Sequence, residues 1–209
     1  MPDFHTLAIF LSAGLALNLT PGPDMLYVAT RSSGEGRAAG LVSALGIATG
    51  CLFHISALAL GLSAVLATVP ALYDGLRYLG AAYLCYLGVR ALMTPSQLEL
   101  GGRLEPRRLS SIFRQGVLTN VLNPKVALFF LALLPQFVDP ARGSPAQQII
   151  VLGLLFNTTG TIVNALVAIG ASRATRWIRS RPRSLTIAQR ATGAIFIGLG
   201  LRLAVSGRR

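Results

Sequence analysis

Charge of either sign is scarce in this sequence of 209 residues. Only 12% of the residues are charged, seven are Asp or Glu, and Lys125 is the single lysine. With 53% hydrophobic residues and a mean hydropathy of +0.61, the chain lies outside the range of soluble globular domains. Its net charge of +12 would suit nucleic acid, but no soluble domain exists to carry a basic face. We expect no nucleic-acid partner.

Cysteine and histidine are equally scarce, with two residues of each. Cys51 and Cys85 fall inside apolar runs, far from any cluster with the spacing of a metal site. We therefore expect two small buried side chains there, no metal and no cofactor.

Long apolar runs are what the sequence does contain. Six of them approach the roughly 20 residues that a helix needs to cross a bilayer. Unpaired backbone groups are not tolerated in lipid, and the runs do not alternate as barrel strands do. The sequence thus predicts an all-α membrane protein of six transmembrane helices in a single domain, residues 1–209. The predicted spans are residues 4–28, 41–69, 76–93, 113–134, 148–171 and 191–205.

Basic residues are distributed unevenly among the predicted loops. Thirteen of the 19 fall in or beside the first, third and fifth loops, and five fall on the other side. By the positive-inside rule we expect loops 1, 3 and 5 to be cytoplasmic and both termini to lie on the opposite face. No Lys or Arg precedes the first run, so we expect it to remain as the first helix and not to be a cleaved signal.

Proline interrupts two of the predicted spans. Pro21 and Pro23 lie in the first span, in the stretch NLTPGPDM, and Pro124 lies in the fourth, in NVLNPK. Because proline has no N–H, each would free the carbonyl oxygen four residues back in a helix. Those carbonyl groups belong to Leu17, Leu19 and Asn120. In lipid they need protein, water or a ligand as a partner.

The first and fourth helices are equivalent if the chain consists of two three-helix halves. The halves would be residues 1–93 and 113–209, joined by a cytoplasmic loop at 94–112, and an odd number of helices makes them inverted repeats. In transporters of that design, substrates bind where corresponding helices are broken. A pair of kinks that serves packing alone is the alternative.

The candidate binding residues surround both interruptions. Asp24 is either a carrier of a coupling proton and partner for a substrate ammonium, or a helix cap. Lys125 is expected to hold a substrate carboxylate or to pair with Asp24; snorkelling to an interface is the alternative. The asparagines can cap the broken ends or contact the substrate. The predicted set is Asn18, Pro21, Gly22, Pro23, Asp24, Asn120, Asn123, Pro124 and Lys125.

Polar and small residues in other helices suggest further roles. Asn157 and Asn164 are about two turns apart on one helix face, where they line a pathway or join helices by hydrogen bonds. Gly46 and Gly50 form a G-x-x-x-G pair that permits close packing within a monomer or between subunits, so a homo-oligomer is possible. His54 is either a proton relay or a packing residue.

Three segments resemble the LysE/RhtB family of amino-acid exporters: residues 15–50, 76–92 and 113–140, which contain the proline-glycine-proline and asparagine-proline-lysine signatures. The resemblance covers the whole chain. It implies a six-helix secondary transporter, not an enzyme, that exports amino acids or similar small metabolites across the bacterial inner membrane by proton antiport. It does not fix the substrate.

Two other classes remain open. An intramembrane thiol-disulfide electron carrier would need its cysteines near the interruptions, whereas Cys51 and Cys85 lie away from both. A metal-ion exporter would need clustered acids, histidines or thiols, which are few here.

Overall fold

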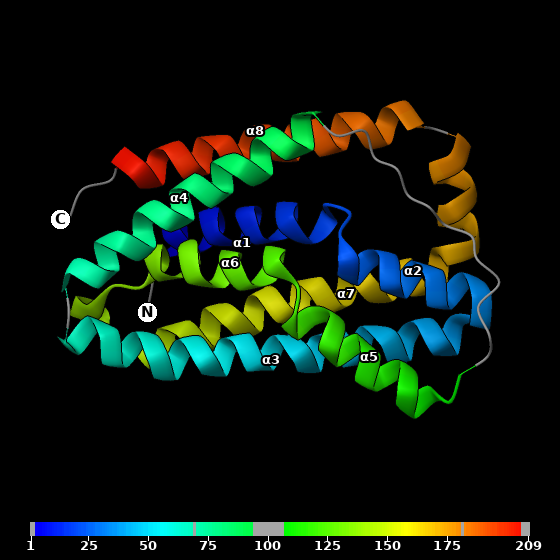
Figure 1. Ribbon diagram of the computed structural model, residues 1–209, viewed down its shortest axis with the longest axis horizontal. Coiled ribbons are helices and arrows are strands. Elements are labelled where there is room, and N and C mark those ends of the chain that lie inside the picture. The colour runs from blue at the N-terminus through cyan, green and yellow to red at the C-terminus, as the bar shows by residue number, and fades with distance from the viewer. Residues whose placement is uncertain (1–2, 69, 94–106, 181, 206–209) are drawn as a thin grey trace.

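The computed structural model describes residues 3–68, 70–93, 107–180 and 182–205, and within those ranges the chain is helical with no strand (Figure 1). This confirms the all-α prediction. The helices are α1 (Phe4–Leu19), α2 (Pro23–Glu35), α3 (Arg37–Thr68), α4 (Pro70–Met93), α5 (Leu109–Val121), α6 (Pro124–Ala132), α7 (Pro145–Ser180) and α8 (Pro182–Val205). Two 3-10 turns, η1 (Leu134–Phe137) and η2 (Pro140–Arg142), connect α6 to α7.

Both predicted interruptions are present. The pairs α1–α2 and α5–α6 are each bent by 48° at their breaks. Pro23 and Pro124 occupy the first positions of α2 and α6, where an N–H would have no acceptor within its own helix, so its absence costs α2 and α6 no hydrogen bond. Proline therefore ends one helix and starts the next at both places.

Most of the helices are longer than the spans that the sequence predicted. Helix α4 starts at Pro70 and not at residue 76, and α7 continues to Ser180 and not 171. Arg31, between the first two predicted spans, lies inside α2, and Arg114, counted with the basic residues beside the third loop, lies inside α5. Apolar runs mark the part of a helix that lipid can surround, whereas the hydrogen-bonded helix continues into polar sequence. The predicted end of the second span, Val69, lies outside the described residues.

Length and composition identify fewer membrane spans than the six predicted. Residues Arg37–Gly61 and Pro145–Gly170 qualify singly, and the two bent pairs raise the total to four among the described residues. Helices α4 and α8 are not among these candidates, although they contain predicted spans 76–93 and 191–205. Each carries several charged residues along its length. The six-span architecture stays a prediction.

The helices form a layered bundle. Figure 1 shows α4 and α8 crossing one side and α3 and α7 the other, with α1 and α6 between them. Helix α4 packs along α8, and α3 packs along both α5 and α7. Helix α6 contacts α4 and α3, so the second break is enclosed on both sides.

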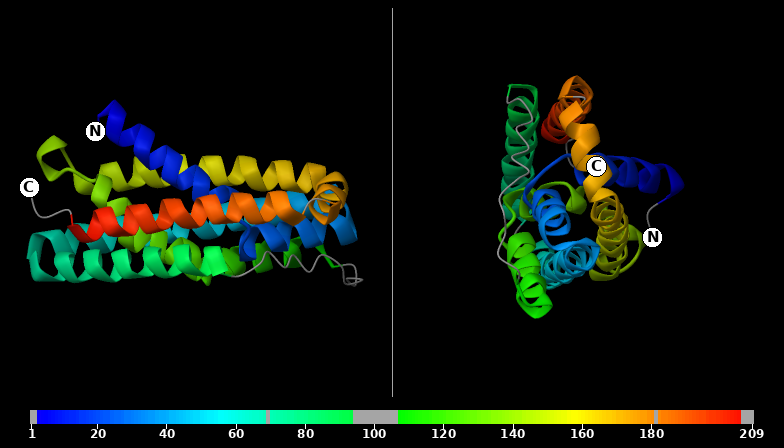
Figure 2. Two further views of the ribbon diagram at one scale, coloured as in Figure 1. Left: turned by 90° about the horizontal axis from the view of Figure 1, so that it is seen from above. Right: turned by 90° about the vertical axis from the view of Figure 1, so that its right-hand side faces the viewer.

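The connections divide between the two ends of the bundle. Helix α1 begins and α8 ends at one end, while the α2–α3 junction at Gly36 and the start of α5 lie at the other (Figures 1 and 2). The orientation of the loops and termini relative to the membrane stays a prediction. Residues 94–106 of the predicted third loop lie outside the described residues.

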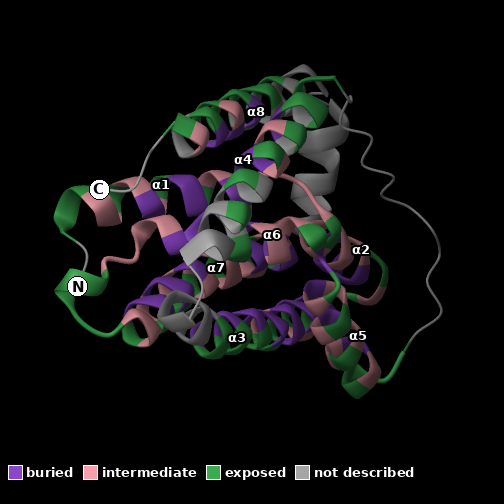
Figure 3. Cartoon of the chain, turned by 60° about the vertical axis from the view of Figure 1, so that its left-hand side comes forward, coloured by how far each residue is buried: buried purple, intermediate pink, exposed green. Residues whose placement is uncertain are grey.

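An aromatic core joins the three helices nearest the breaks. The rings of Phe129 and Phe156 stack at 4.6 Å between centroids, and Phe130 meets Phe156 edge-on at 5.4 Å. Phe10 of α1 packs against Phe129 at 6.1 Å. All four side chains are buried, in agreement with the interior faces in Figure 3. Helices α1, α6 and α7 are thereby held at a fixed spacing around the breaks.

Glycines allow α3 and α5 to approach closely. A Cβ atom at Gly46 would overlap the carbonyl oxygen of Phe113, and one at Gly50 would lie 2.6 Å from the carbonyl oxygen of Val117. The reciprocal Cβ at Gly116 would lie 2.8 Å from the carbonyl oxygen of Ser43. The predicted G-x-x-x-G pair therefore packs within the chain, against the helix that precedes the second break.

Candidate functional site

The first break consists of Thr20, Pro21 and Gly22, between α1 and α2. Thr20 is the C-cap of α1, and its N–H donates to the carbonyl oxygens of Ala16 and Leu17, each at 3.1 Å. Gly22, the N-cap of α2, is fully extended and has no side chain to cap the helix. The chain thus leaves the negative end of one helix dipole close to the positive end of another.

Lys125 reaches this break from α6. Its Nζ donates to the carbonyl oxygens of Leu17 at 3.1 Å and Thr20 at 2.9 Å, so the ammonium lies at the negative end of α1. A Cβ atom at Gly22 would lie 3.0 Å from Nζ, and glycine leaves this space to the lysine stem. Lys125 therefore partners the Leu17 carbonyl that the sequence predicted to be free. It forms no ion pair with Asp24 in the described part of the chain.

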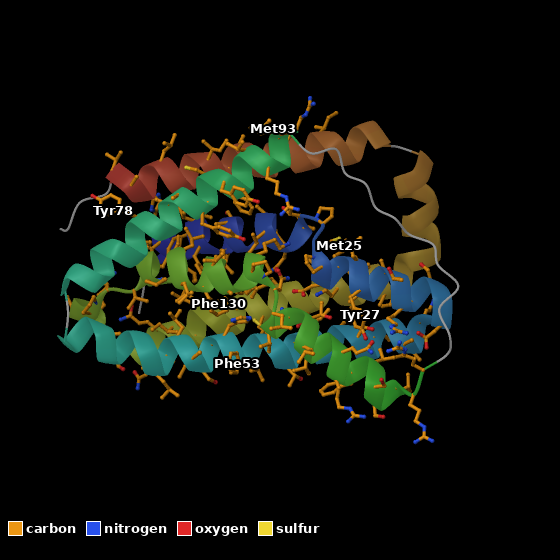
Figure 4. All side chains as sticks on the ribbon, viewed as in Figure 1. Met25, Tyr27, Phe53, Tyr78, Met93 and Phe130 are labelled. Atoms are coloured by element: carbon orange, nitrogen blue, oxygen red, sulfur yellow. The ribbon has the colours of Figure 1, made fainter. Side chains whose placement is uncertain are left out.

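Asp24 lies in the first turn of α2, at the positive end of that helix, where the sequence allowed a capping role. Its Oδ2 accepts a 2.8 Å hydrogen bond from Nδ2 of Asn120, in the last turn of α5. This contact joins the two breaks directly. In Figure 4 the neighbouring Met25 lies at the start of α2, and Phe130 lies in the interior on α6.

The backbone of Asn120 is also held in place. Its carbonyl oxygen accepts from the N–H of Asn123 at 2.9 Å and lies 3.0 Å from Nε2 of His54. Because a carbonyl oxygen only accepts, Nε2 of His54 carries the hydrogen. The ring of His54 packs beside Phe130, 5.9 Å away. His54 thus satisfies the carbonyl that Pro124 frees, a role that the sequence analysis did not assign to it.

Asn123 caps the second half of the broken helix. Its Oδ1 accepts from the N–H of Lys125 at 3.0 Å, as the capping prediction expected. The same cap fixes the backbone from which the Lys125 side chain extends toward the first break. Pro124 between them is the first residue of α6.

Three polar atoms at the site are buried without a hydrogen bond of good geometry in the described part of the chain, although the side chain of Asn123 interacts with Asp24. They are Oδ1 of Asp24, Oδ1 of Asn120 and Nδ2 of Asn123. Asn120 and Asn123 are only 2% and 1% exposed. Their amide orientations follow from their other bonds, since Asp24 can only accept from Asn120 and the Lys125 N–H can only donate to Asn123. Unpaired buried polar atoms are costly, so their concentration between the breaks marks a place for a ligand or water.

Asn18 of the predicted binding set, and Asn157 and Asn164 of the predicted pathway, lie away from the contact between Asp24 and Asn120. Nδ2 of Asn18 donates to the carbonyl oxygen of Phe156 at 3.3 Å and to Oγ1 of Thr159 at 3.1 Å, which ties α1 to α7. Nδ2 of Asn157 donates to the carbonyl oxygen of Ala48 at 3.2 Å, the interhelical bond that the sequence offered as the alternative to a pathway. Asn164 is buried on the same helix.

A second polar group, which the sequence analysis missed, joins α2 to α5 nearer the Gly36 end. Arg31 is 5% exposed, pairs with Glu35, and donates through Nη2 to Oε1 of Gln115 at 2.9 Å. The hydroxyl of Tyr27 donates to the carbonyl oxygen of Ile112 at 2.8 Å. The signal was the four-residue spacing of Tyr27, Arg31 and Glu35, which places all three on one helix face. The spacing was overlooked because Arg31 lies between the first two predicted spans and was counted as a loop residue.

No group of three or more His, Cys, Asp or Glu side chains with the geometry of a metal site occurs in the ranges that the structure describes. Cys51 is buried on α3 and Cys85 lies on α4, and neither is in a disulfide.

Comparison with known proteins identifies the family of the chain. The LysE type translocator model matches residues 15–207. An uncharacterized membrane protein of Pseudomonas aeruginosa is 34% identical over 195 residues, 90% of this chain and 89% of the relative. The homoserine/homoserine lactone efflux protein of Salmonella typhimurium is 28% identical over 93% of this chain and 94% of its own. The leucine efflux protein of Klebsiella pneumoniae is 26% identical over 93% of this chain and 92% of its own.

No solved structure matches the chain. The match to the family model nevertheless covers most of the sequence, including both helix breaks and every residue of the site between them. The family comprises transporters and not enzymes. The chain belongs to the LysE type translocator family.

Proposed function

We propose that this protein is a secondary active exporter that moves amino acids or similar small metabolites across the bacterial inner membrane by proton antiport. The family and the efflux proteins among its relatives support an exporter. Homoserine and leucine, the amino acids in those names, share an α-amino group, which gives the substrate class a common chemical feature.

The observation that carries the proposal is the half-satisfied carboxylate of Asp24. One oxygen accepts from Asn120 across the two breaks, and the side chain of Asn123 also interacts with the carboxylate, but among the described residues the other oxygen has no hydrogen bond of good geometry. An ionisable group inside a membrane protein is expensive and is by default functional. Asp24 is therefore the place where substrate and protons act on the protein.

Antiport follows if proton and substrate compete for the free oxygen of Asp24. When ionised, the carboxylate accepts hydrogen bonds from a substrate ammonium. When protonated, its O–H donates to the free Oδ1 of Asn120 and no charge attracts the ammonium. Because the two states exclude each other, proton entry on one side and substrate release on the other use the same group.

Alternating access requires the contacts across the breaks to open. At the breaks themselves, hydrogen bonds from Asn120 to Asp24 and from Lys125 to the α1 carbonyl groups join α5 to α2 and α6 to α1. In our proposal α1–α2 and α5–α6 are corresponding spans of two inverted halves, and these bonds exchange during transport. The matching 48° bends support that correspondence.

For orientation we propose that loops 1, 3 and 5 are cytoplasmic and that both termini face the periplasm. The excess of basic residues in those loops supports this orientation. The Gly36 end of the bundle, with the Arg31 group, would then face the cytoplasm.

Export by reconstituted protein tests the function. Purified protein in proteoliposomes is loaded with a mixture of amino acids, and their release is followed with and without an imposed pH gradient. We expect selective release of a few amino acids that accelerates when protons can enter in exchange. A release rate that is the same with and without the pH gradient would contradict antiport. Absence of release for every amino acid would contradict the substrate class.

Asp24→Asn is the matched site variant, and Asp3→Asn is its control. Both remove one carboxylate, but Asp3 is exposed and caps α1 through Thr6, a role that asparagine also fills. We expect Asp24→Asn to abolish proton-driven release and Asp3→Asn to leave it unchanged. Equal rates in the two variants would remove Asp24 from the mechanism.

The two alternative functions, a thiol-disulfide electron carrier and a metal-ion exporter, gain no support. Both cysteines are free, and Cys51 is buried, as a structural thiol would be. Neither relative named above as an efflux protein is an electron carrier or a metal exporter by its name.

A further inference from the structure

Helix α2 carries a row of polar side chains on the face that meets α5. The row consists of Asp24, Tyr27, Arg31 and Glu35. Their spacings of three and four residues place them on one face of the helix. The row begins in the first turn after the break, with Asp24, and ends directly before Gly36.

Every member of this row is hydrogen-bonded to α5 or to the residues just before it. Asp24, Tyr27 and Arg31 bond to α5 itself, and Figure 4 shows Tyr27 between the two helices. Oε2 of Glu35 accepts from the N–H of Arg107 at 2.7 Å. The four partners are Asn120, Gln115, Ile112 and Arg107. The row and these partners form a polar seam that runs from the site between the breaks to the Gly36 end of the bundle.

Apolar packing holds the other side of α2 on α3 and α7. Val28 is completely buried in a small cluster with Ala44 and Ile47 of α3 and Ala168 of α7. The hydroxyl of Ser32 donates to the carbonyl oxygen of Ala168. In the described part of the chain, no residue of α5 belongs to this cluster. Helix α2 is therefore joined to α5 chiefly by the hydrogen bonds of the polar seam.

Glycine lies at both ends of α2. Gly22 is extended and provides no side-chain cap, and Gly36 has a φ of 92°, which favours glycine. Helix α5, in contrast, is fixed to α3, because Gly46 and Gly50 bring the two backbones into contact. A change of shape at this end of the bundle can thus turn α2 between its two glycines while α3 and α5 move together.

We propose that the polar seam is the gate between the site and the Gly36 end of the bundle, and that α2 is its moving part. In the structure the gate is closed. When the seam opens, water replaces the lost hydrogen-bond partners, so opening costs less than the separation of an apolar interface of equal extent. Charged side chains inside membrane proteins commonly face such pathways. The inference rests on the proposed function, because a gate needs a transported substrate.

A thiol placed behind the gate tests the inference. Thr119 lies one turn from Gln115 on the same face of α5 and directly before Asn120. Thr119→Cys therefore puts a side chain of similar size between the seam and the site. A membrane-impermeant thiosulfonate reagent is added to one side of the membrane, and the labelling rate at position 119 is measured by mass spectrometry.

Three further positions complete the experiment. Cys51→Ala removes the buried thiol of α3 from the background. The native Cys85 stays as a measure of folding, because it packs beside Gly200 at the contact between α4 and α8. Arg37→Cys, at an exposed position at the start of α3, shows from which side of the membrane the reagent reaches the Gly36 end.

Gln115→Met is the gate variant, since it removes the acceptor of Arg31 and keeps an unbranched side chain. Its matched control is Gln147→Met, at an exposed position near the start of α7. Loss of a hydrogen bond to a charged group favours the open state, so we expect labelling from the Gly36 side to become faster by about tenfold. We expect Gln147→Met to stay within about twofold of the unaltered reporter, and labelling of Cys85 not to change.

Tyr27→Phe keeps the inference testable if Gln115→Met does not fold. It removes only the hydroxyl that donates to the carbonyl oxygen of Ile112, so we expect labelling to become faster by about fivefold. Tyr86→Phe, at an exposed position on α4, is its control. Gate variants that label no faster than their controls overturn the inference. So does a parallel rise at Cys85, which would mean general unfolding.

A transported amino acid provides a readout that a purely structural seam would not move. If α2 is a gate, a saturating amino acid on the Gly36 side shifts the open and closed populations and changes the labelling rate at position 119 by about threefold or more. An unchanged rate, in protein that releases amino acids from proteoliposomes, overturns the gate while the proposed function stands. Absence of release for every amino acid overturns the proposed function and the gate together.

Discussion

The side chain of Asn120 donates a 2.8 Å hydrogen bond to Oδ2 of Asp24, and this bond links the last turn of α5 to the first turn of α2. The two residues are 96 positions apart in the chain. Their contact places both proline-induced breaks in one site. It also leaves one oxygen on each residue unpaired, so the site is held together without being saturated.

Replacement of Asn120 by alanine removes the donor to Asp24. We expect a loss of about 2 kcal/mol of stability, the usual value of a hydrogen bond to a charged group, and a loss of proton-driven export. Thermal unfolding in detergent and release from proteoliposomes measure the two effects. The control is Thr119→Ala, because the hydroxyl of Thr119 bonds only to the Gln115 carbonyl oxygen in its own helix. Equal stability and equal export rates of the two variants would show that the hydrogen bond of Asn120 contributes to neither.

The breaks were predictable because their cause is local. Pro23 and Pro124 cannot continue a helix wherever they occur, so their positions in apolar runs indicated where α2 and α6 begin. The cap at Asn123 was equally local. The partner of Lys125 was not predictable, because its long stem reaches whichever carbonyl groups the tertiary packing of α6 against α1 brings near.

Arg31 shows that the burial of a charged residue could not be predicted from the sequence. Its charge and its position after an apolar run made it look like a loop residue, yet it is buried between α2 and α5. Whether a charged residue near a span end faces water or Gln115 depends on the neighbouring helix, which composition does not reveal. The number of spans is a similar limit, because the predicted spans in α4 and α8 are not among the candidate spans of the described residues.

Replacement of Lys125 by methionine leaves the carbonyl groups of Leu17 and Thr20 without the ammonium. The hydrophobic stem is conserved in length, so the change tests the hydrogen bonds and the charge. We expect unfolding to be easier by about 2 kcal/mol, because two buried acceptors lose a charged donor. Arg114→Met, which removes a cation from the exposed side of α5, is the control and should stay within about 0.5 kcal/mol. A stable Lys125→Met protein would show that α1 is held at the break by other contacts.

Replacement of Arg31 by glutamine removes the side-chain cation from Glu35, which keeps the N–H of Arg107 as a donor at 2.7 Å. Both side chains of the pair are 7% exposed, and loss of a hydrogen bond to a charged group costs about 2 kcal/mol. Chemical or thermal unfolding of the variant in detergent measures the loss. Arg37→Gln, at an exposed position at the start of α3, removes the same charge and is expected to have no effect. If both variants unfold alike, the Arg31 group does not stabilise the contact between α2 and α5.

Replacement of Gly46 by alanine forces α3 and α5 apart. The new methyl group would overlap the backbone carbonyl oxygen of Phe113, which cannot rotate away as a side chain can, so one helix must shift. Overpacking of this kind costs about 2 kcal/mol. Because Asn120 lies in the last turn of α5, the shift should also lower the export rate by displacing the donor to Asp24. Gly61→Ala on the same helix is the control: no atom of the described residues lies within 4 Å of its added Cβ, and alanine favours a helix, so we expect equal or slightly higher stability. Unfolding temperatures of the two variants in one detergent, read beside their export rates, would separate the close packing from the general effect of removing a glycine. A Gly46→Ala protein as stable and active as the Gly61→Ala protein would mean that α5 can move without cost to the site.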